Sequence, residues 1–353
     1  MPGFRSHSIA TISYVIHPTD QNMQLSHEKK KDDRGAVERF KPIAKWAIAF
    51  IVLVFLFLTI QKAYADVMLH REHLDFSALD WRWMIAGVFA YAVGMFPAAI
   101  AWLQTLSGFG QNVPLRAGFH AYFLGHLGKY VPGKAMVIVM RVARLAPLGI
   151  EIKPTVVAIF VETLTSIAVG AVLGCVFLFF LPEFPPSWMI AGAAVCIPCS
   201  IVLLLPHTFR AILAVLAKSK IGRMPRSVSE AFTWKMMIRT CLWMAIGWLI
   251  HGTAGWLVLS GIQSTPGLST FQAWAACVSA IALGSVVGFA SMLPGGAGIR
   301  ELVITWLLSS IVPQPIALFA AIAFRIANLT AEFLVVGAVS IIKGKTIATR
   351  TVV

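Results

Sequence analysis

The chain contains 353 residues, of which 58% are apolar and 12% are charged, and its mean hydropathy is +0.80. Soluble domains average about 45–50% apolar and about 25% charged residues, so this composition excludes an ordinary cytosolic enzyme, a disordered protein and a disulfide-stapled secreted module. The net charge of +14 accompanies long apolar segments. It therefore indicates membrane topology and attraction to anionic lipid headgroups, and we expect no nucleic-acid partner.

Residues 1–42 are polar and uneven in charge, which predicts a disordered cytoplasmic tail. Met23 lies within this tail and is a second candidate start. Apolar runs follow at about 43–60, 83–104, 117–140, 154–181, 188–206, 240–260, 271–293, 299–312 and 315–342. A helix needs about 20 residues to cross the hydrocarbon core, so most of these runs predict membrane spans. We expect an all-α polytopic membrane bundle over 43–343 and a cytoplasmic tail over 344–353.

Two of these segments do not have the pattern of a simple span. The first, 117–140, contains Pro132-Gly133-Lys134, and the second, 271–312, contains Pro294-Gly295-Gly296-Ala297-Gly298. Proline and glycine break helices, and the freed backbone groups are tolerated at membrane depth only against protein or a water-filled cavity. We therefore expect two broken, re-entrant helix hairpins. In the alternative, 271–293 crosses fully and the next two runs form a hairpin.

Loop charges predict which side of the membrane each loop faces. The segment 1–45 carries eight Lys/Arg and the loop 207–239 carries seven, so both are expected in the cytoplasm, as are both chain termini. Both ends of 117–140 are basic, so this segment dips from inside. If 271–312 dips from outside, the second half repeats the first upside down, and a shift of 162 positions superposes the two Pro-Gly pairs. Such inverted repeats recur in transporters.

Ionisable groups inside apolar runs are candidate functional residues, since each costs at least about 2.5–3.5 kcal/mol at the membrane centre. Glu162, Arg325 and Glu332 either pair in a polar cavity or form ion pairs that only fix helix register. Arg141 lies near the inner boundary, where snorkelling or topology marking is the favoured interpretation. His126 and His251 stand alone in apolar runs and are expected to be packed and hydrogen-bonded.

A glycine-rich break before a helix exposes backbone N–H groups that can hold a lipid phosphate. The alternative is a glycine hinge that only lets helices pack closely. The candidate substrate-binding residues are Lys129, Pro132, Gly133, Lys134, Glu162, Pro294, Gly295, Gly296, Gly298, Arg300, Glu301, Arg325 and Glu332.

Several catalytic signatures are missing from the sequence. It contains no P-loop, HExxH motif or Ser/His/Asp order, and the predicted loops are short. Cys196 and Cys199 have the spacing of a redox or metal pair, but their purely apolar flanks favour packing thiols. We expect no catalytic residue, metal or cofactor. A small membrane-embedded transferase stays as a disfavoured alternative.

The nine residues Leu293–Glu301 include the order Pro-Gly-Gly-x-Gly-x-Arg-Glu. This element resembles the membrane domain of the lysylphosphatidylglycerol synthase/flippase family, and Gly125–Lys134 resembles its first-half counterpart. Arg325 matches the arginine of that family's last helix, and the likeness spans roughly 40–343. Glu162 falls where the family has Glu-Arg, but Thr163 replaces the arginine here.

The resemblance implies a multi-pass protein of the bacterial or archaeal cytoplasmic (inner) membrane with re-entrant helices. In the best-understood members this domain moves an aminoacylated phospholipid between leaflets, and a separate soluble domain makes that lipid. Some stand-alone relatives are linked to polyprenyl-phosphate sugar pathways. This chain ends at Val353, so we expect no synthase domain and do not carry over aminoacyl transfer.

The expected function is a flippase-like translocator of an anionic phospholipid or polyprenyl-phosphate-linked lipid. The alternative is a non-transporting membrane partner of a glycosyltransferase or another lipid-modifying enzyme. Membrane lipids are the expected partners in either case.

Overall fold

The structure, a computed structural model, describes Gln61 and residues 79–130, 135–182, 186–217, 225–262, 267–291 and 293–350. The expected N-terminal tail over 1–42 and the first apolar run over 43–60 lie outside these residues, as do Pro132, Gly133 and Lys134. All the helices below belong to one compact unit, 55–353.

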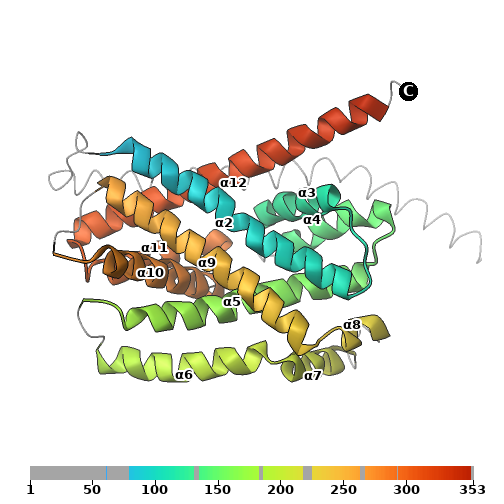
Figure 1. Ribbon diagram of the computed structural model, residues 1–353, viewed down its shortest axis with the longest axis horizontal. Helices are drawn as coiled ribbons and strands as arrows, with labels where there is room; N and C mark the ends of the chain where they lie inside the picture. The colour runs from blue at the N-terminus through green and yellow to red at the C-terminus, as the bar shows by residue number, and fades with distance from the viewer. Residues whose placement is uncertain are drawn as a thin grey trace, which may run out of the picture. The chain divides into compact units, whose positions relative to one another are not determined.

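The described residues are predominantly helical and contain no β-strand, which confirms the all-α prediction. The helices are α2 Trp81–Gly108, α3 Leu115–His126, α4 Ala135–Leu145, α5 Ile152–Leu178, α6 Ser187–Leu204, α7 Pro206–Ala217, α8 Arg226–Glu230, α9 Trp234–Ile262, α10 Thr270–Ala290, α11 Ile299–Leu308 and α12 Gln314–Arg350 (Figure 1). Three short 3-10 segments join them: η3 Leu127–Tyr130, η4 Ala146–Leu148 and η5 Pro294–Gly296.

Six helices are long and apolar enough to cross a membrane: α2, α5, α6, α9, α10 and the portion 314–341 of α12. The chain is therefore a multi-pass membrane protein. The helix α12 continues to Arg350 and includes most of the segment predicted as a tail over 344–353. The run predicted over 188–206 is divided between α6 and α7.

Among the described helices, α2 and α9 have the most extensive contact, and they run side by side in Figure 1. Asp80 caps α2 by accepting a hydrogen bond from the backbone N–H of Arg82 (3.0 Å), and its own N–H donates to the carbonyl of Gly261 at the end of α9 (2.9 Å). Trp102 of α2 and Val258 of α9 are buried in one continuous apolar core with α3, α5, α10 and α12. This core surrounds the polar groups described below.

Both interrupted segments form hairpins of packed helices. Helix α3 packs on α4 across η3, and α10 packs on α11 across η5. Helices α3, α4 and α11 have 12, 11 and 10 residues, or roughly 15–18 Å at 1.5 Å per residue, which is too short to span a hydrocarbon core of about 30 Å. The segments η3 and η5 contact each other. The second break therefore lies where the sequence predicts it, at Pro294–Gly296, whereas the residues predicted for the first break lie outside the described part, between η3 and α4.

Close backbone approach explains the glycines at these tips. A Cβ atom on Gly128 would lie 2.6 Å from the backbone nitrogen of Val137 in α4. Gly296 has a φ of +68°, and a Cβ atom there would lie 3.0 Å from the Cα atom of Gly288 in α10. Side chains at Gly128 and Gly296 would force each hairpin apart.

Candidate functional site

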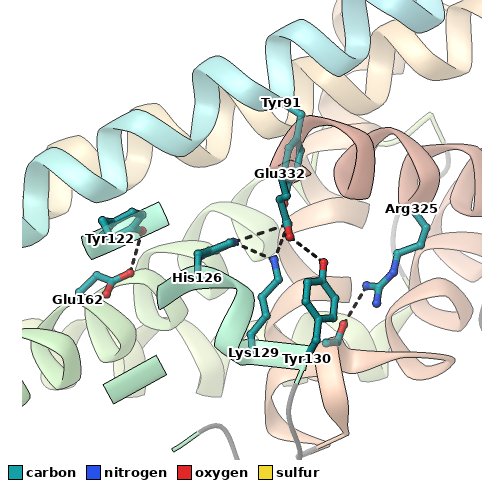
Figure 2. A network of polar contacts seen from close by, with 9 residues as sticks. Tyr91, Tyr122, His126, Lys129, Tyr130, Glu162, Arg325 and Glu332 are labelled. Atoms are coloured by element: carbon teal, nitrogen blue, oxygen red, sulfur yellow. Dashed lines mark hydrogen bonds and ion pairs between the residues drawn. The ribbon is translucent and has the colours of Figure 1, made fainter. Parts of the chain in front are cut away.

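Glu332 of α12 lies at the centre of the polar network in Figure 2. Its side chain is 1% exposed and accepts hydrogen bonds from Lys129 Nζ (2.5 Å), the Tyr130 hydroxyl (2.7 Å) and the Tyr91 hydroxyl (3.3 Å). His126 Nε2 lies 3.6 Å from the same carboxylate. A buried carboxylate requires such partners because desolvation of its charge is otherwise very unfavourable. Glu332 thus ties η3 and α2 to α12.

A second buried ion pair joins α4 to α5. Arg141 Nη1 donates to Glu162 Oε2 (2.5 Å), and the Tyr122 hydroxyl donates to Glu162 Oε1 (3.0 Å). The Arg141 guanidinium lies over the rings of Trp102 and Tyr122, at 4.8 and 4.1 Å from their centroids, a cation–π arrangement. Arg141 is only 2% exposed, so its interpretation as a snorkelling residue is wrong. Arg141 therefore provides the positive charge beside Glu162 that the resemblance led us to expect at position 163, where this chain has threonine.

Arg325 of α12 holds the second break. Its Nη1 donates to the carbonyl of Gly295 (2.9 Å; Figure 2). The same nitrogen lies 3.7 Å from the Glu301 carboxylate. Its guanidinium also lies 5.8 Å from the centre of the Tyr130 ring in the first break. Glu301 in addition caps its own helix, because its Oε2 accepts a hydrogen bond from the backbone N–H of Gly298 (2.7 Å). That N–H, predicted to face a phosphate, is therefore occupied.

Arg300 of α11 differs from the other three basic residues. With the Asn328 amide oriented so that both its ends are paired, Asn328 accepts from Arg300 Nη2 (2.8 Å), and the Arg300 guanidinium lies 5.5 Å from the Phe324 ring centre. Within the described residues Arg300 forms no ion pair with a carboxylate. The cations Lys129, Arg141, Arg300 and Arg325 thus outnumber the carboxylates Glu162, Glu301 and Glu332 by one.

A cavity of about 190 Å³, here called the central chamber, lies between these elements. Its polar lining includes Lys129, Arg300, Glu162, His251, Ser166 and Ser285. The buried Nε2 atom of His251 has no hydrogen-bond partner among the described residues. His251 was expected to be packed and hydrogen-bonded. It does stack on the Tyr91 ring at 4.4 Å between centroids, but the hydrogen bond is absent within the described part.

A second cavity of about 480 Å³, here called the side groove, has mainly apolar walls from α4, α5 and α10. Phe160 and Phe289 in these walls are 51% and 38% exposed, so in a membrane they would face lipid. Lys129, Ser285 and Arg300 line both the side groove and the central chamber. These three residues therefore mark where a polar space meets an apolar one.

The structure brings most of the candidate residues together. Lys129, Glu162, Arg300 and the two break glycines Gly295 and Gly296 line the chamber or the groove. Glu301, Arg325 and Glu332 hold the surrounding helices, and Gly298 is the N-cap of α11. The side chain of Pro294 is outside the described part, as are all atoms of Pro132, Gly133 and Lys134.

The residues predicted from the sequence do not include Tyr91, Tyr122 and Tyr130, whose hydroxyl groups donate hydrogen bonds to Glu332 and Glu162. A usable signal existed, since these are three of only five tyrosines in the chain and all lie in or beside apolar runs. Within the described residues, no group of three His, Cys, Asp or Glu side chains is placed to hold a metal ion.

These features define a multi-pass helical membrane protein in which two broken hairpins meet beside a polar chamber. Residues 43–335 match the family described as lysylphosphatidylglycerol synthase TM region, and the chain belongs to this family. No curated protein matches the sequence. Membership confirms the resemblance noted at Leu293–Glu301.

Proposed function

We propose that this protein binds the headgroup of an anionic phospholipid or polyprenyl-phosphate-linked lipid in the central chamber and moves that lipid between leaflets. The observation that carries this proposal is the sharing of Lys129, Ser285 and Arg300 by the polar chamber and the apolar side groove. A lipid likewise combines a polar headgroup with apolar chains. Its headgroup would occupy the chamber while its chains stay in the groove and the bilayer.

The charge distribution supports an anionic headgroup. Arg300 lines both cavities without a carboxylate partner among the described residues. A cation held away from bulk water is unfavourable unless it is paired. A phosphate at the junction of the two cavities would supply that pairing. Lys129 would assist it from η3.

The helix arrangement supports re-entrant hairpins and an inverted repeat as part of the same proposal. Figure 1 shows the α3–α4 hairpin toward the right and the α10–α11 hairpin toward the left, and their tips η3 and η5 are in contact. Helices α5 and α12 begin at Ile152 and Gln314, which are separated by the 162-residue shift inferred from the sequence. Tips that meet between opposed hairpins are expected near the membrane midplane.

In this arrangement the membrane domain over 43–343 is a single transport unit with both termini in the cytoplasm, in a bacterial or archaeal inner membrane. Loop charge supports this orientation. Family membership supports the membrane location.

One observation favours the non-transporting alternative. The contacts of Glu332 and Arg325 tie the hairpin tips firmly to α12, and translocation requires some of these contacts to change. A lipid-carrier binder that serves a glycosyltransferase needs no such change. The experiment below separates the two.

The test is leaflet exchange of a fluorescent phosphatidylglycerol in vesicles, with dithionite quenching of the outer leaflet. Vesicles with protein should lose more fluorescence than empty vesicles, and Arg300→Gln should abolish the difference. Arg116→Gln is the matched control, because Arg116 is exposed on α3. Binding without exchange would support the alternative. Neither binding nor exchange would overturn both.

A further inference from the structure

The charge balance of the central chamber restricts the charge of a ligand. Lys129 pairs with Glu332, and Arg141 pairs with Glu162. Arg325 faces Glu301. Arg300 is left as one cation without a carboxylate among the described residues. One negative charge on the ligand would neutralise it. A phosphodiester carries one negative charge, whereas a phosphomonoester carries about −1.5 to −2 at pH 7.

Each carboxylate of the described site already accepts hydrogen bonds from the protein. These bonds limit how the site could bind an amine-bearing headgroup. Glu332 accepts three hydrogen bonds, and Glu162 accepts one from Tyr122 and one from Arg141. Glu301 caps α11. Of these acids only Glu162 lines the chamber, and each of its two oxygens already accepts a hydrogen bond. The unpartnered Oε1 of Glu301 lies outside the chamber lining. A headgroup ammonium would add a positive charge beside Arg300. Amine-bearing headgroups therefore fit this chamber poorly.

The wall of the chamber contributed by α5, α9 and α10 offers neutral hydrogen-bonding groups. His251 Nε2 is buried and unpartnered within the described part, and Ser166 and Ser285 line the same space. Trp248 also lines this wall, and its indole N–H donates a hydrogen bond to the backbone carbonyl of Ser166 (2.9 Å). Buried polar atoms are normally hydrogen-bonded, and an imidazole nitrogen pairs well with a hydroxyl group.

From these observations we infer that the lipid is a phosphodiester of single negative charge whose head is an uncharged polyol, such as glycerol or a sugar. Arg300 contacts the phosphate, and His251 with the two serines contacts the hydroxyl groups. This inference rests on the proposed function and narrows its substrate class. It excludes aminoacylated and ethanolamine lipids, and it excludes bare phosphomonoesters.

The test uses the full chain in phosphatidylcholine nanodiscs and competes lipids of matched acyl chains. The probes are phosphatidylglycerol, phosphatidic acid, phosphatidylethanolamine and lysylphosphatidylglycerol, with bound lipid measured by native mass spectrometry. Phosphatidylglycerol should bind at least fivefold more tightly than the other three. A polyprenyl phosphohexose in a further arm distinguishes a sugar-bearing carrier from a glycerophospholipid, and either source satisfies the inference.

Two variants test the polyol contacts. His251→Phe keeps a ring that can stack on Tyr91 but removes the imidazole nitrogen, and Ser166→Ala removes one hydroxyl. Each should reduce the preference for phosphatidylglycerol over phosphatidic acid to below twofold, with phosphatidic acid binding unchanged. Ser166→Ala carries the test if His251→Phe fails to fold.

Equal binding of lysylphosphatidylglycerol and phosphatidylglycerol would overturn the inference, as would an unchanged preference in the folded variants. If anionic lipids bind better than phosphatidylcholine but do not differ from each other, only this inference fails. If no anionic lipid binds, the proposed function fails with it.

Discussion

Lys129 of η3 and Glu332 of α12 form an ion pair between residues 203 positions apart in the chain. The pair joins the tip of the first hairpin to the last helix, and the acid is 1% exposed. Tyr130, the next residue after Lys129 and its neighbour in η3, donates to the other oxygen of the same carboxylate. The hydrogen bonds of Lys129 and Tyr130 to α12 therefore converge on one side chain, Glu332.

Glu332→Gln should destabilise the protein strongly, because it leaves the Lys129 ammonium without its carboxylate. Loss of one partner of a buried pair costs about 3–5 kcal/mol. Thermal unfolding in detergent measures the effect against the exposed control Arg82→Gln. The double variant Lys129→Met, Glu332→Leu should recover part of the loss. Equal stability of Glu332→Gln and the control would contradict this role.

The Arg141–Glu162 and Arg325–Glu301 pairs should differ in coupling energy. The first has a direct hydrogen bond and two cation–π contacts, whereas the second has 3.7 Å between its charged atoms. Double-mutant cycles with Arg→Met and Glu→Gln should give about 1–3 kcal/mol for the first pair and a smaller value for the second. A larger coupling energy for the Arg325–Glu301 pair than for the Arg141–Glu162 pair would contradict this interpretation.

Gly128→Ala should prevent close packing of η3 on α4, since the added Cβ atom meets backbone and not a movable side chain. Overpacking of this kind costs about 1–3 kcal/mol or more. Gly192→Ala is the matched control, because nothing lies within 4 Å of a Cβ atom at that position. Unfolding midpoints of the two variants provide the comparison. A midpoint for Gly128→Ala as high as that of the control would show that the hairpin tip tolerates separation.

Filling the side groove should slow lipid exchange without unfolding the protein. Thr163→Trp places a bulky ring in the groove lining, and exchange should fall about tenfold, equivalent to about 1.4 kcal/mol in the barrier. Val195→Trp is the control, since Val195 is 65% exposed on α6. Unchanged exchange in a folded Thr163→Trp protein would place the lipid path elsewhere.

Re-entry of the second hairpin predicts restricted access to its tip. A cysteine at Ser291, just after α10, should react poorly with a membrane-impermeant maleimide from either side, after subtraction of labelling at the five native cysteines. A cysteine at Phe271, which is 50% exposed at the start of α10, should react from the outside. Efficient labelling of position 291 from the cytoplasm would instead support a full crossing by α10.

The sequence predicted the breaks and several of the charged residues because their signals are local. Proline, glycine and ionisable groups stand out inside apolar runs, and this revealed Lys129, Arg300 and Glu332. The choice of partners is not local, since it depends on how each helix is rotated against distant ones. Arg141 was expected at the membrane surface for this reason, whereas the packing of α2 and α3 buries it beneath Trp102 and Tyr122.

The contact between Lys129 and Glu332 bears on the inverted repeat proposed above. Counted from the first residue of each helix, Gly170 in α5 occupies the place that Glu332 occupies in α12. Two copies of the N-terminal half, paired head to tail, would each present an ammonium group to a glycine. In the proposed repeat the two halves are therefore complementary at this contact and not interchangeable, because the first half supplies the ammonium group and the second half supplies the acid.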